Sequence, residues 1–124
     1  MFILGSHYTR GEIHAQLGGS RVSCLPTRDG VIVAACLSKD FSPQAPGVVL
    51  CGKGPRTSPV SALFAAQTTA LPVFLKNASS RWQYQGRFFV AQSWSAGAEF
   101  ESYIAGSGRV VTSVSHVVVL RRCG

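Results

Sequence analysis

The sequence predicts an α+β fold with about six strands, two well-defined helices and a weaker third helix. The first observation is Leu71–Trp94, where two apolar and aromatic runs flank the turn-forming residues Asn77–Ser80 and predict a β-hairpin. The second is Thr9–Glu12, which fits a helix capping box. The third is Arg109–Leu120, whose β-branched residues favour a long strand. A hairpin alone is marginally stable in water, so other strands and a helix must cover its apolar face.

The chain has 124 residues, which we expect to form a single domain, 1–124, that buries roughly two thirds of its unfolded surface. Hydrophobic residues make up 46% and charged residues 14%, as in globular proteins. No apolar run approaches the roughly 20 residues of a membrane helix. Met1–Leu4 has no basic segment before it and polar residues follow, unlike a signal peptide. We therefore expect a cytoplasmic protein with no membrane partner.

The charge balance is strongly basic, with 12 Lys and Arg against 5 Asp and Glu and a formal net charge of +7. Six cations precede residue 62 and six follow it, so the whole chain is basic. Nine of the twelve are Arg, whose planar guanidinium suits bidentate contacts with phosphates and base edges. This balance favours a nucleic-acid partner.

The first elements follow from local signals. The capping box predicts a helix over Arg10–Leu17, which two glycines end. Arg21–Leu25 is predicted as a short strand that ends at a proline, and Thr27–Gly30 as a hairpin turn because it contains an Asp-Gly step. Val31–Leu37 is apolar at nearly every position, which predicts a strand buried on both faces in the centre of the sheet.

The middle of the chain contains two loops. Lys39–Gly47 has two prolines and no periodicity, so we expect an ordered surface loop, followed by a short strand at Val48–Cys51. Gly52–Arg56 is a glycine-bearing cationic loop that lacks the Walker and dinucleotide patterns; a backbone phosphate contact and an ordinary tight turn are both open. A helix is then predicted from a Ser58 cap, with Pro59 in its first turn, to about residue 68.

The second arm of the hairpin has one mostly apolar face. Trp82, Tyr84 and Phe88 share this face, and Gly86 between them marks a bulge or a close approach of the backbone. The polar stretch that follows holds a weak helix at Ala98–Ala105 with one apolar side.

The four cysteines have no CxxC spacing, and the first three lie in or beside apolar runs, where a reduced thiol is a small buried hydrophobe. The histidines form no ligand pairs with them, so we expect no disulfide framework, no metal site and no cofactor. These residues are Cys24, Cys36, Cys51 and Cys123, and His7, His14 and His116.

Several short motifs occur in a characteristic order. They are Tyr8-Thr9-Arg10, Glu12-Ile13, Leu17-Gly18-Gly19, Leu25-Pro26, Pro43 with Ala45-Pro46, Gly52 with Gly54-Pro55, Pro72-Val73-Phe74 with Lys76, and Trp82 with Tyr84 and Gly86. Together they resemble a bacterial domain found joined to McrA-type HNH nucleases, in the SRA-like and PUA-like group of modified-base readers. The resemblance covers most of Tyr8–Ser93, although Ser42 stands where the family pattern has Asn. The chain has no His-Asn-His nuclease segment, which implies a reader that does not cut and is not an enzyme.

The resemblance implies a curved, mostly antiparallel sheet, partly closed into a barrel, with two or three short helices outside. It also implies a concave pocket in which a base turned out of the stack lies against aromatic rings. Tyr8, Trp82 and Tyr84 are the candidate stacking residues, and Asp40 is the candidate acceptor for an exocyclic amine. Packing in the core or on the sheet explains Trp82 and Tyr84 equally well.

Our main functional hypothesis is a restriction-associated module that binds DNA without cutting it. The module is either specific for a modified base or binds DNA without this specificity. An RNA-binding PUA-like module is the first alternative, and a ligand-binding or oligomer-forming protein without a nucleic-acid role is the second. A small ribonuclease-like enzyme that uses a histidine is the weakest, because no histidine has a recognisable partner. The candidate phosphate contacts are Arg10, Lys39, Lys53, Arg56, Lys76, Arg81 and Arg87.

Overall fold

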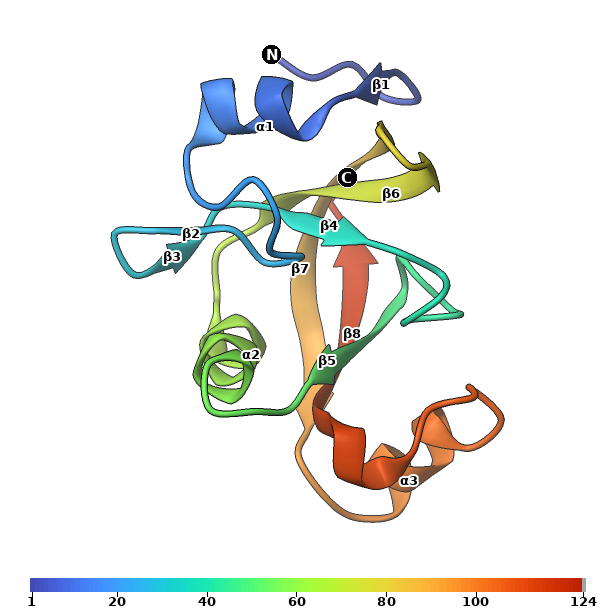
Figure 1. Ribbon diagram of the computed structural model, residues 1–124. Coiled ribbons are helices and arrows are strands. Elements are labelled where there is room, and N and C mark those ends of the chain that lie inside the picture. Colours follow the sequence, from blue (N-terminus) through green and yellow to red (C-terminus); the bar gives the residue numbers. More distant parts are fainter. Residues whose placement is uncertain (124) are drawn as a thin grey trace.

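The computed structural model describes residues 1–123 and places three α-helices around a mixed sheet (Figure 1). In chain order the elements are β1 (His7–Tyr8), α1 (Arg10–Leu17), β2 (Thr27–Arg28), β3 (Val31–Ile32), β4 (Ala35–Leu37), β5 (Val48–Gly52), α2 (Thr57–Ala66), β6 (Leu71–Ala78), β7 (Arg81–Trp94), α3 (Ala98–Ile104), the short 3-10 helix η1 (Val111–Ser113) and β8 (Val114–Arg122). No helix in the described part of the chain is long and apolar enough to cross a membrane.

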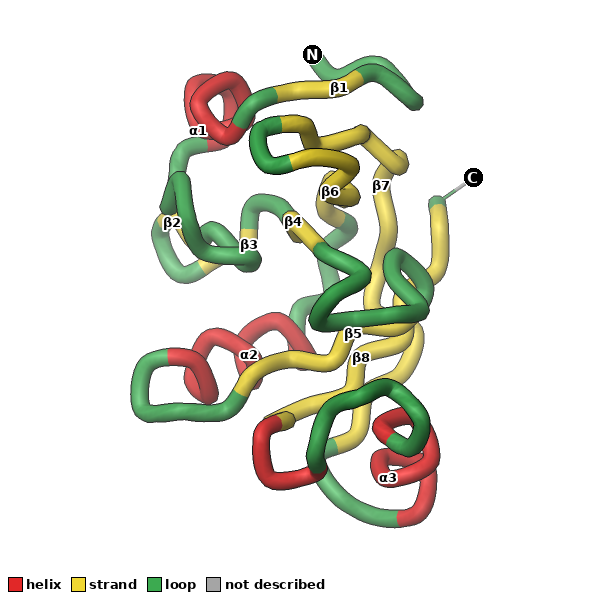
Figure 2. The backbone as a smooth tube through the Cα atoms, turned by 45° about the vertical axis from the view of Figure 1, so that its right-hand side comes forward, coloured by secondary structure: helices red, strands yellow, loops and turns green. Residues whose placement is uncertain are grey.

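The main sheet has the strand order β4-β6-β7-β8-β5, and β1 pairs with β7 outside this path. The β4–β6 pair is parallel and the other pairs are antiparallel. Strands β2 and β3 form a separate hairpin. The α+β class and the curved sheet are therefore confirmed. The sheet does not close into a barrel, because β4 and β5 remain its two outer strands (Figures 1 and 2).

The predicted hairpin is formed by β6 and β7, and it lies at the centre of the sheet, the place that the sequence had assigned to Val31–Leu37. Val73 pairs with Gly86 and Phe74 pairs with Tyr84, so Gln85 is an extra residue on β7. Gly86 has φ +106°, a conformation that glycine adopts at little cost. The predicted bulge is therefore confirmed. It divides β7, which pairs with β1 before the bulge and with β8 after it.

Two strand predictions in the first half of the chain are wrong. Val31–Leu37 forms two short strands instead of one, and β4 lies at the edge of the sheet. The segment is still buried from Ala34 to Leu37, because Cys36 N–H donates to Cys24 O (2.8 Å) and the chain before β2 covers the outer side of β4. Arg21–Leu25 forms no strand, because Cys24 O is the only backbone group of this segment that forms a described hydrogen bond with β4.

All three predicted helices are present, α1 with the predicted boundaries and α2 and α3 with slightly changed ones. Helix α1 has the capping box: Glu12 N–H donates to Thr9 Oγ1 (3.1 Å), and Thr9 N–H donates to Glu12 Oε1 (2.9 Å). Helix α2 begins at Thr57 without a side-chain cap, because Ser58 Oγ accepts from Gly54 N–H (3.0 Å) and so braces the preceding loop. Helix α3 lies where the weak helix was expected.

The last strand also begins later than predicted. The prediction was Arg109–Leu120, but residues 111 to 113 form η1, and β8 runs from Val114 to Arg122 between β7 and β5. Val117 and Val118 are both completely buried, because α2 and α3 cover the two sides of this strand. Figure 1 shows these helices on either side of β8 and α1 at the other end of the sheet.

The outer edge of β5 is occupied by side chains. Leu50 N–H donates to Ser42 Oγ (3.0 Å), and Leu50 O accepts from Arg109 Nη1 (3.3 Å). Ser61 Oγ donates to Gly52 O (3.0 Å) from the first half of α2. Ser42 and Ser61 are 4% and 0% exposed, so both serve as buried partners of backbone groups that have no neighbouring strand.

Candidate nucleic-acid interface

A groove with a volume of about 640 Å³ lies between the two outer strands, β4 and β5. Its walls come from the start of α1, the segment 22–25, β4 and the loop after it, β5, the first half of α2, and the β6–β7 hairpin. The curvature of the open sheet brings these distant segments together. Figure 1 shows the segment before β2 (light blue) passing β4, and the loop after β4 (teal) leading toward β5.

The charged residues of this groove are mostly cations. Arg10, Arg56, Lys76 and Arg109 line it, and Asp40 is the one acid among its described lining residues. Like charges gathered along a concave surface raise the local potential and attract the opposite charge. The groove is therefore suited to an anionic ligand.

Trp82 is the aromatic residue that connects two of these cations. The Arg10 guanidinium carbon lies 5.4 Å from the centre of its ring, and the Lys76 ammonium lies 5.7 Å from it. Both distances fit cation–π contacts. Trp82 thus positions two positive charges at the groove.

Tyr8 and Tyr84, the other two predicted stacking residues, do not line the groove. They pack with Phe2 and Phe74 in an aromatic cluster, with ring centres 5.0 Å apart for Phe2–Tyr8 and 5.3 Å apart for Phe74–Tyr84. The Tyr8 hydroxyl accepts from Ile3 N–H (2.7 Å). Packing against other aromatic rings, the alternative considered for Tyr84, therefore describes its surroundings, and Tyr8 lies in the same cluster.

The structure brings together five of the predicted site residues and leaves the others outside the groove. Lining it are Arg10, Asp40, Arg56, Lys76 and Trp82. Outside it are Tyr8, Lys39, Lys53, Arg81, Tyr84 and Arg87. Of these, Arg87 Nη2 donates to Ala70 O (3.1 Å).

Arg10 fixes one wall of the groove. Its Nη2 donates to Ser20 O (2.9 Å) and to Ser23 O (2.7 Å), while its Nε is buried without a partner. Because the same guanidinium lies over Trp82, it ties the segment before β2 to the start of β7. The first residue of a helix thus holds together two segments far apart in the sequence.

Arg109 fixes the opposite wall, and sequence reasoning missed it. Its guanidinium donates to Phe41 O (3.0 Å), to Leu50 O (3.3 Å) and to Ser113 O (3.1 Å). Only its charge was visible in the sequence, because its three carbonyl partners are brought together by the fold.

Three of the four cysteines line the groove, which the sequence did not indicate. Burial raises the pKa of Cys36 and of Cys51 to about 12, and desolvation also raises the pKa of Cys24. Cys24 was expected to be buried but is exposed, because its segment is not a strand. All three are neutral thiols near pH 7. No group of three or more His, Cys, Asp or Glu in the described residues is placed to hold a metal ion.

The histidines lie on three different elements, and none lines the groove. His7 Nε2 accepts from Asn77 Nδ2 (2.7 Å), and His14 Nδ1 donates to Gly19 O (2.7 Å). His116 shares a hydrogen bond with Ser115 Oγ (2.7 Å), and desolvation lowers its pKa. The geometry gives them no common site.

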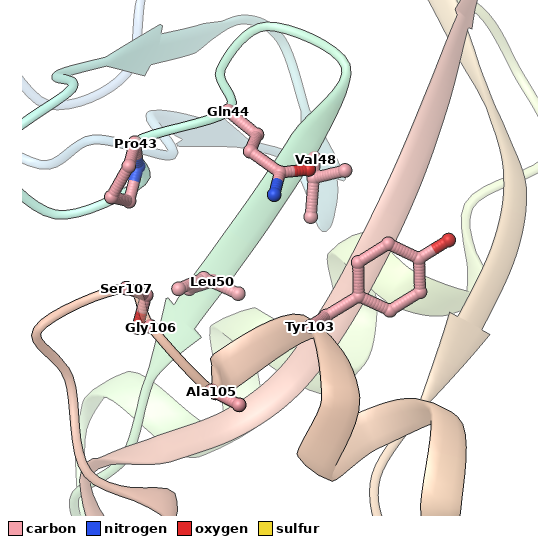
Figure 3. A pocket seen from close by; sticks show the side chains of 8 residues that line it. All are labelled: Pro43, Gln44, Val48, Leu50, Tyr103, Ala105, Gly106 and Ser107. Atoms are coloured by element: carbon pink, nitrogen blue, oxygen red, sulfur yellow. The ribbon is translucent and has the colours of Figure 1, made fainter.

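A second, smaller cavity of about 70 Å³ lies between β5 and α3 (Figure 3). Its lining holds no charged side chain, and its volume is comparable with that of a few water molecules. It is therefore a packing feature. The labelled residues are Pro43, Gln44, Val48, Leu50, Tyr103, Ala105, Gly106 and Ser107.

Fold and groove together define an α+β domain with an open sheet and a basic groove along the open side. No family model matches this chain, and no curated protein matches it. One similar solved structure is that of the Type IV phosphorothioation-dependent restriction endonuclease ScoMcrA, with a TM-score of 0.52 and 17% sequence identity. The match covers 97% of this chain and 27% of that one, so this chain shares its fold with a part of that enzyme.

Proposed function

We propose that the chain is a nucleic-acid-binding module that reads DNA, including a modified base, and does not cut it. The observation that carries the proposal is the groove itself, where four cations and one acid line a concave surface. Its likeness in fold to part of a modification-dependent restriction endonuclease supports DNA over RNA. The sequence contains no His-Asn-His nuclease segment, so the proposal assigns binding alone to this chain.

Arg56 and Lys76 are the phosphate contacts in this proposal. Within residues 1–123, neither side chain forms a salt bridge or a hydrogen bond, and Lys76 contacts only the Trp82 ring among aromatic groups. Arg10 and Arg109 already donate to backbone carbonyls, so they add positive charge but few free donors. Free cations beside fixed ones are suited to a flexible phosphate backbone.

The depth of the groove is suited to a base. Its inner wall is apolar, with Leu25, Leu37 and Val49 nearly fully buried, and Asp40 supplies an acceptor at the mouth. A base removed from the stack would lie against this wall while its backbone stays at the cations. The same apolar wall favours the alternative of a small apolar ligand.

A binding screen by fluorescence anisotropy tests the proposal, using single-stranded and duplex DNA and RNA with unmodified and modified cytosine, at two salt concentrations. We expect duplex DNA to bind most tightly. The double variant Arg56→Gln/Lys76→Gln should lose most of this affinity, whereas Arg121→Gln, an exposed cation outside the groove, should retain it. An equal loss of affinity in the double variant and in Arg121→Gln would show that binding depends on net charge and not on the groove. No binding by the wild type would leave the small-ligand alternative.

A further inference from the structure

The face of the sheet opposite α2 carries an exposed aromatic ring in the middle of a strand. Phe88 of β7 packs with Phe64 of α2 in the core. Neighbouring residues of a strand point to opposite faces, so Phe89 lies on the other side of the sheet. On that side α3 covers β8 only near its start, at Val117, and α1 lies at the other end of the sheet (Figure 1). Phe89 is therefore 39% exposed, although its strand is paired on both sides.

Two arginines flank this ring. Arg121 of β8 is the residue directly opposite Phe89, and opposite side chains on one face are in reach of each other. Arg87 lies two residues before Phe89 on β7 and so shares its face. Both arginines are exposed, and none of the three residues lines the groove. We call Arg87, Phe89 and Arg121 the outer patch.

The two arginines of the outer patch differ in how they are held. Arg87 Nη2 donates to Ala70 O (3.1 Å), so this cation is fixed beside the ring. Within residues 1–123, the Arg121 side chain forms no hydrogen bond and no salt bridge. Its neighbour Arg122 donates to Gln85 O and lies over the Phe88 ring, on the opposite face. Arg121 is thus the free donor of the outer patch.

The charge around the outer patch has one sign. Strands β6, β7 and β8 together contain five of the twelve Lys and Arg and none of the five Asp and Glu. A single exposed hydrophobic residue is common, but a ring between two cations on a rigid sheet combines a stacking surface with positive charge. This combination suits a ligand in which flat apolar groups alternate with negative charges, as bases and phosphates do.

The open shape of the outer patch selects the form of the nucleic acid. The bases of a duplex are stacked on both sides, so a ring on a sheet surface cannot reach their faces. The bases of a single strand can turn outward and stack on an aromatic side chain. A duplex therefore gains no stacking contact at Phe89.

We propose that the outer patch is a second binding site, which takes single-stranded nucleic acid. Phe89 stacks on one base, Arg121 contacts an adjacent phosphate, and Arg87 adds positive charge. The site is separate from the groove, so this inference goes beyond the proposed function. Every base has a π face, so we expect binding with little sequence preference. One copy of the chain then holds a duplex in the groove and a single strand on the outer patch.

Anisotropy titrations with three probes test this inference: an oligothymidylate of about 12 nucleotides, an abasic strand of the same length, and a duplex of unmodified DNA. Phe89→Leu keeps an apolar side chain but removes the ring, so it should weaken oligothymidylate binding by about tenfold. The wild type should bind the abasic strand about tenfold more weakly than oligothymidylate, and Phe89→Leu should not weaken it further. Phe89→Tyr, which keeps the ring, should bind as the wild type does.

The two sites should respond to different variants. Arg121→Gln should reduce the slope of log affinity for oligothymidylate against log salt by about 0.7, the value for one phosphate of a single strand, and leave duplex binding unchanged. Arg56→Gln/Lys76→Gln should lose duplex binding and keep oligothymidylate affinity within about threefold. The matched control is Leu63→Ala, because Leu63 is 37% exposed but lies on α2 and outside the groove. It should bind all three probes as the wild type does.

Several results would overturn this inference and leave the proposed function intact. These are wild-type affinity of Phe89→Leu for oligothymidylate, equal affinity of the wild type for the abasic strand and oligothymidylate, and an equal loss of duplex and oligothymidylate binding in Phe89→Leu. Self-association in sedimentation velocity that depends on Phe89, without oligothymidylate binding, would assign the outer patch to a second copy and overturn it as well. Oligothymidylate binding that depends on Phe89, without duplex binding, would overturn the proposed function and support this inference.

Discussion

The side-chain amide of Gln67 binds both backbone groups of Ile32. Ile32 N–H donates to Gln67 Oε1 (3.0 Å), and Gln67 Nε2 donates to Ile32 O (2.9 Å). Ile32 is only 1% exposed, and β3 pairs with β2 alone, so this amide takes the place of a missing strand neighbour. It also joins the end of α2 to the β2–β3 hairpin.

Gln67→Ala should therefore destabilise the fold. Both backbone groups of Ile32 would lose their partner in a buried position, which costs about 1 to 3 kcal/mol in the free energy of unfolding. Urea denaturation followed by circular dichroism measures this change. Gln16→Ala, an exposed helical glutamine without a hydrogen bond among those described, should have almost no effect. Equal midpoints for the two variants would contradict the role of Gln67.

Tyr84→Ala should affect stability without affecting binding. The Tyr84 ring packs against Phe74 and against Phe2, at 5.7 Å between ring centres, and it does not line the groove. Because Tyr84 is only half-buried, we expect a loss of about 2 kcal/mol, below the range for a fully buried ring. Tyr84→Phe, which keeps the ring, should be close to the wild type. Weaker DNA binding by folded Tyr84→Ala would restore the stacking hypothesis for this residue.

Trp82→Ala, in contrast, should weaken binding. Without this ring, the Lys76 ammonium loses its cation–π contact, so affinity for nucleic acid should fall by roughly tenfold. Trp82→Phe keeps an aromatic face and should recover part of the affinity. Anisotropy titrations at one salt concentration measure both variants. Wild-type affinity in Trp82→Ala would show that the ring has no role in binding.

Salt should weaken binding steeply, because phosphates neutralised by Arg and Lys release their counterions. Contacts to ~5 phosphates would cost on the order of several hundredfold in affinity for a fourfold rise in salt. Lys76→Gln and Arg56→Gln should each reduce the slope of log affinity against log salt by about one, and the Arg121→Gln control should not. A flat salt dependence in the wild type would remove the electrostatic basis of the proposal.

Alkaline pH should destabilise the protein through its buried thiols. The Cys51 thiol has a folded pKa of about 12 against an ordinary value of 9.0, so above pH 9 the unfolded state loses its proton first. Stability therefore falls as pH rises from 9 toward 12, by about 1.4 kcal/mol per pH unit for one such thiol. In Cys51→Ala, the slope of unfolding free energy against pH in this window should be shallower. An identical slope would contradict the assignment.

The sequence predicted the elements that local chemistry determines. The hairpin, the bulge at Gly86 and the Thr9 capping box each depend on neighbouring residues, and the structure has all three. It could not place β4, because an apolar run reports burial on both faces but not which chain segments provide it. An edge strand covered by the segment at Cys24 gives the same pattern as a central strand.

The candidate site could be predicted only in part, because the sequence does not show which distant segments come together. The sequence identified Trp82 and Tyr84 as aromatic candidates. Only the fold shows that Trp82 lines the groove and that Tyr84 packs against Phe2. Arg109 was not distinguished from other cations, since its partners at Phe41 and Leu50 come from distant segments. The sequence alone also does not indicate which hydrophobic residues are exposed.

The side chains along the outer edge of β5 have a consequence for how copies of this protein behave beside one another. An open strand edge normally recruits a strand from another molecule and begins aggregation. Here both backbone groups of Leu50 are already bound by Ser42 and Arg109, and Gly52 O is bound by Ser61. Copies of the protein at high concentration would therefore not exchange strands at this edge, even though the sheet stays open.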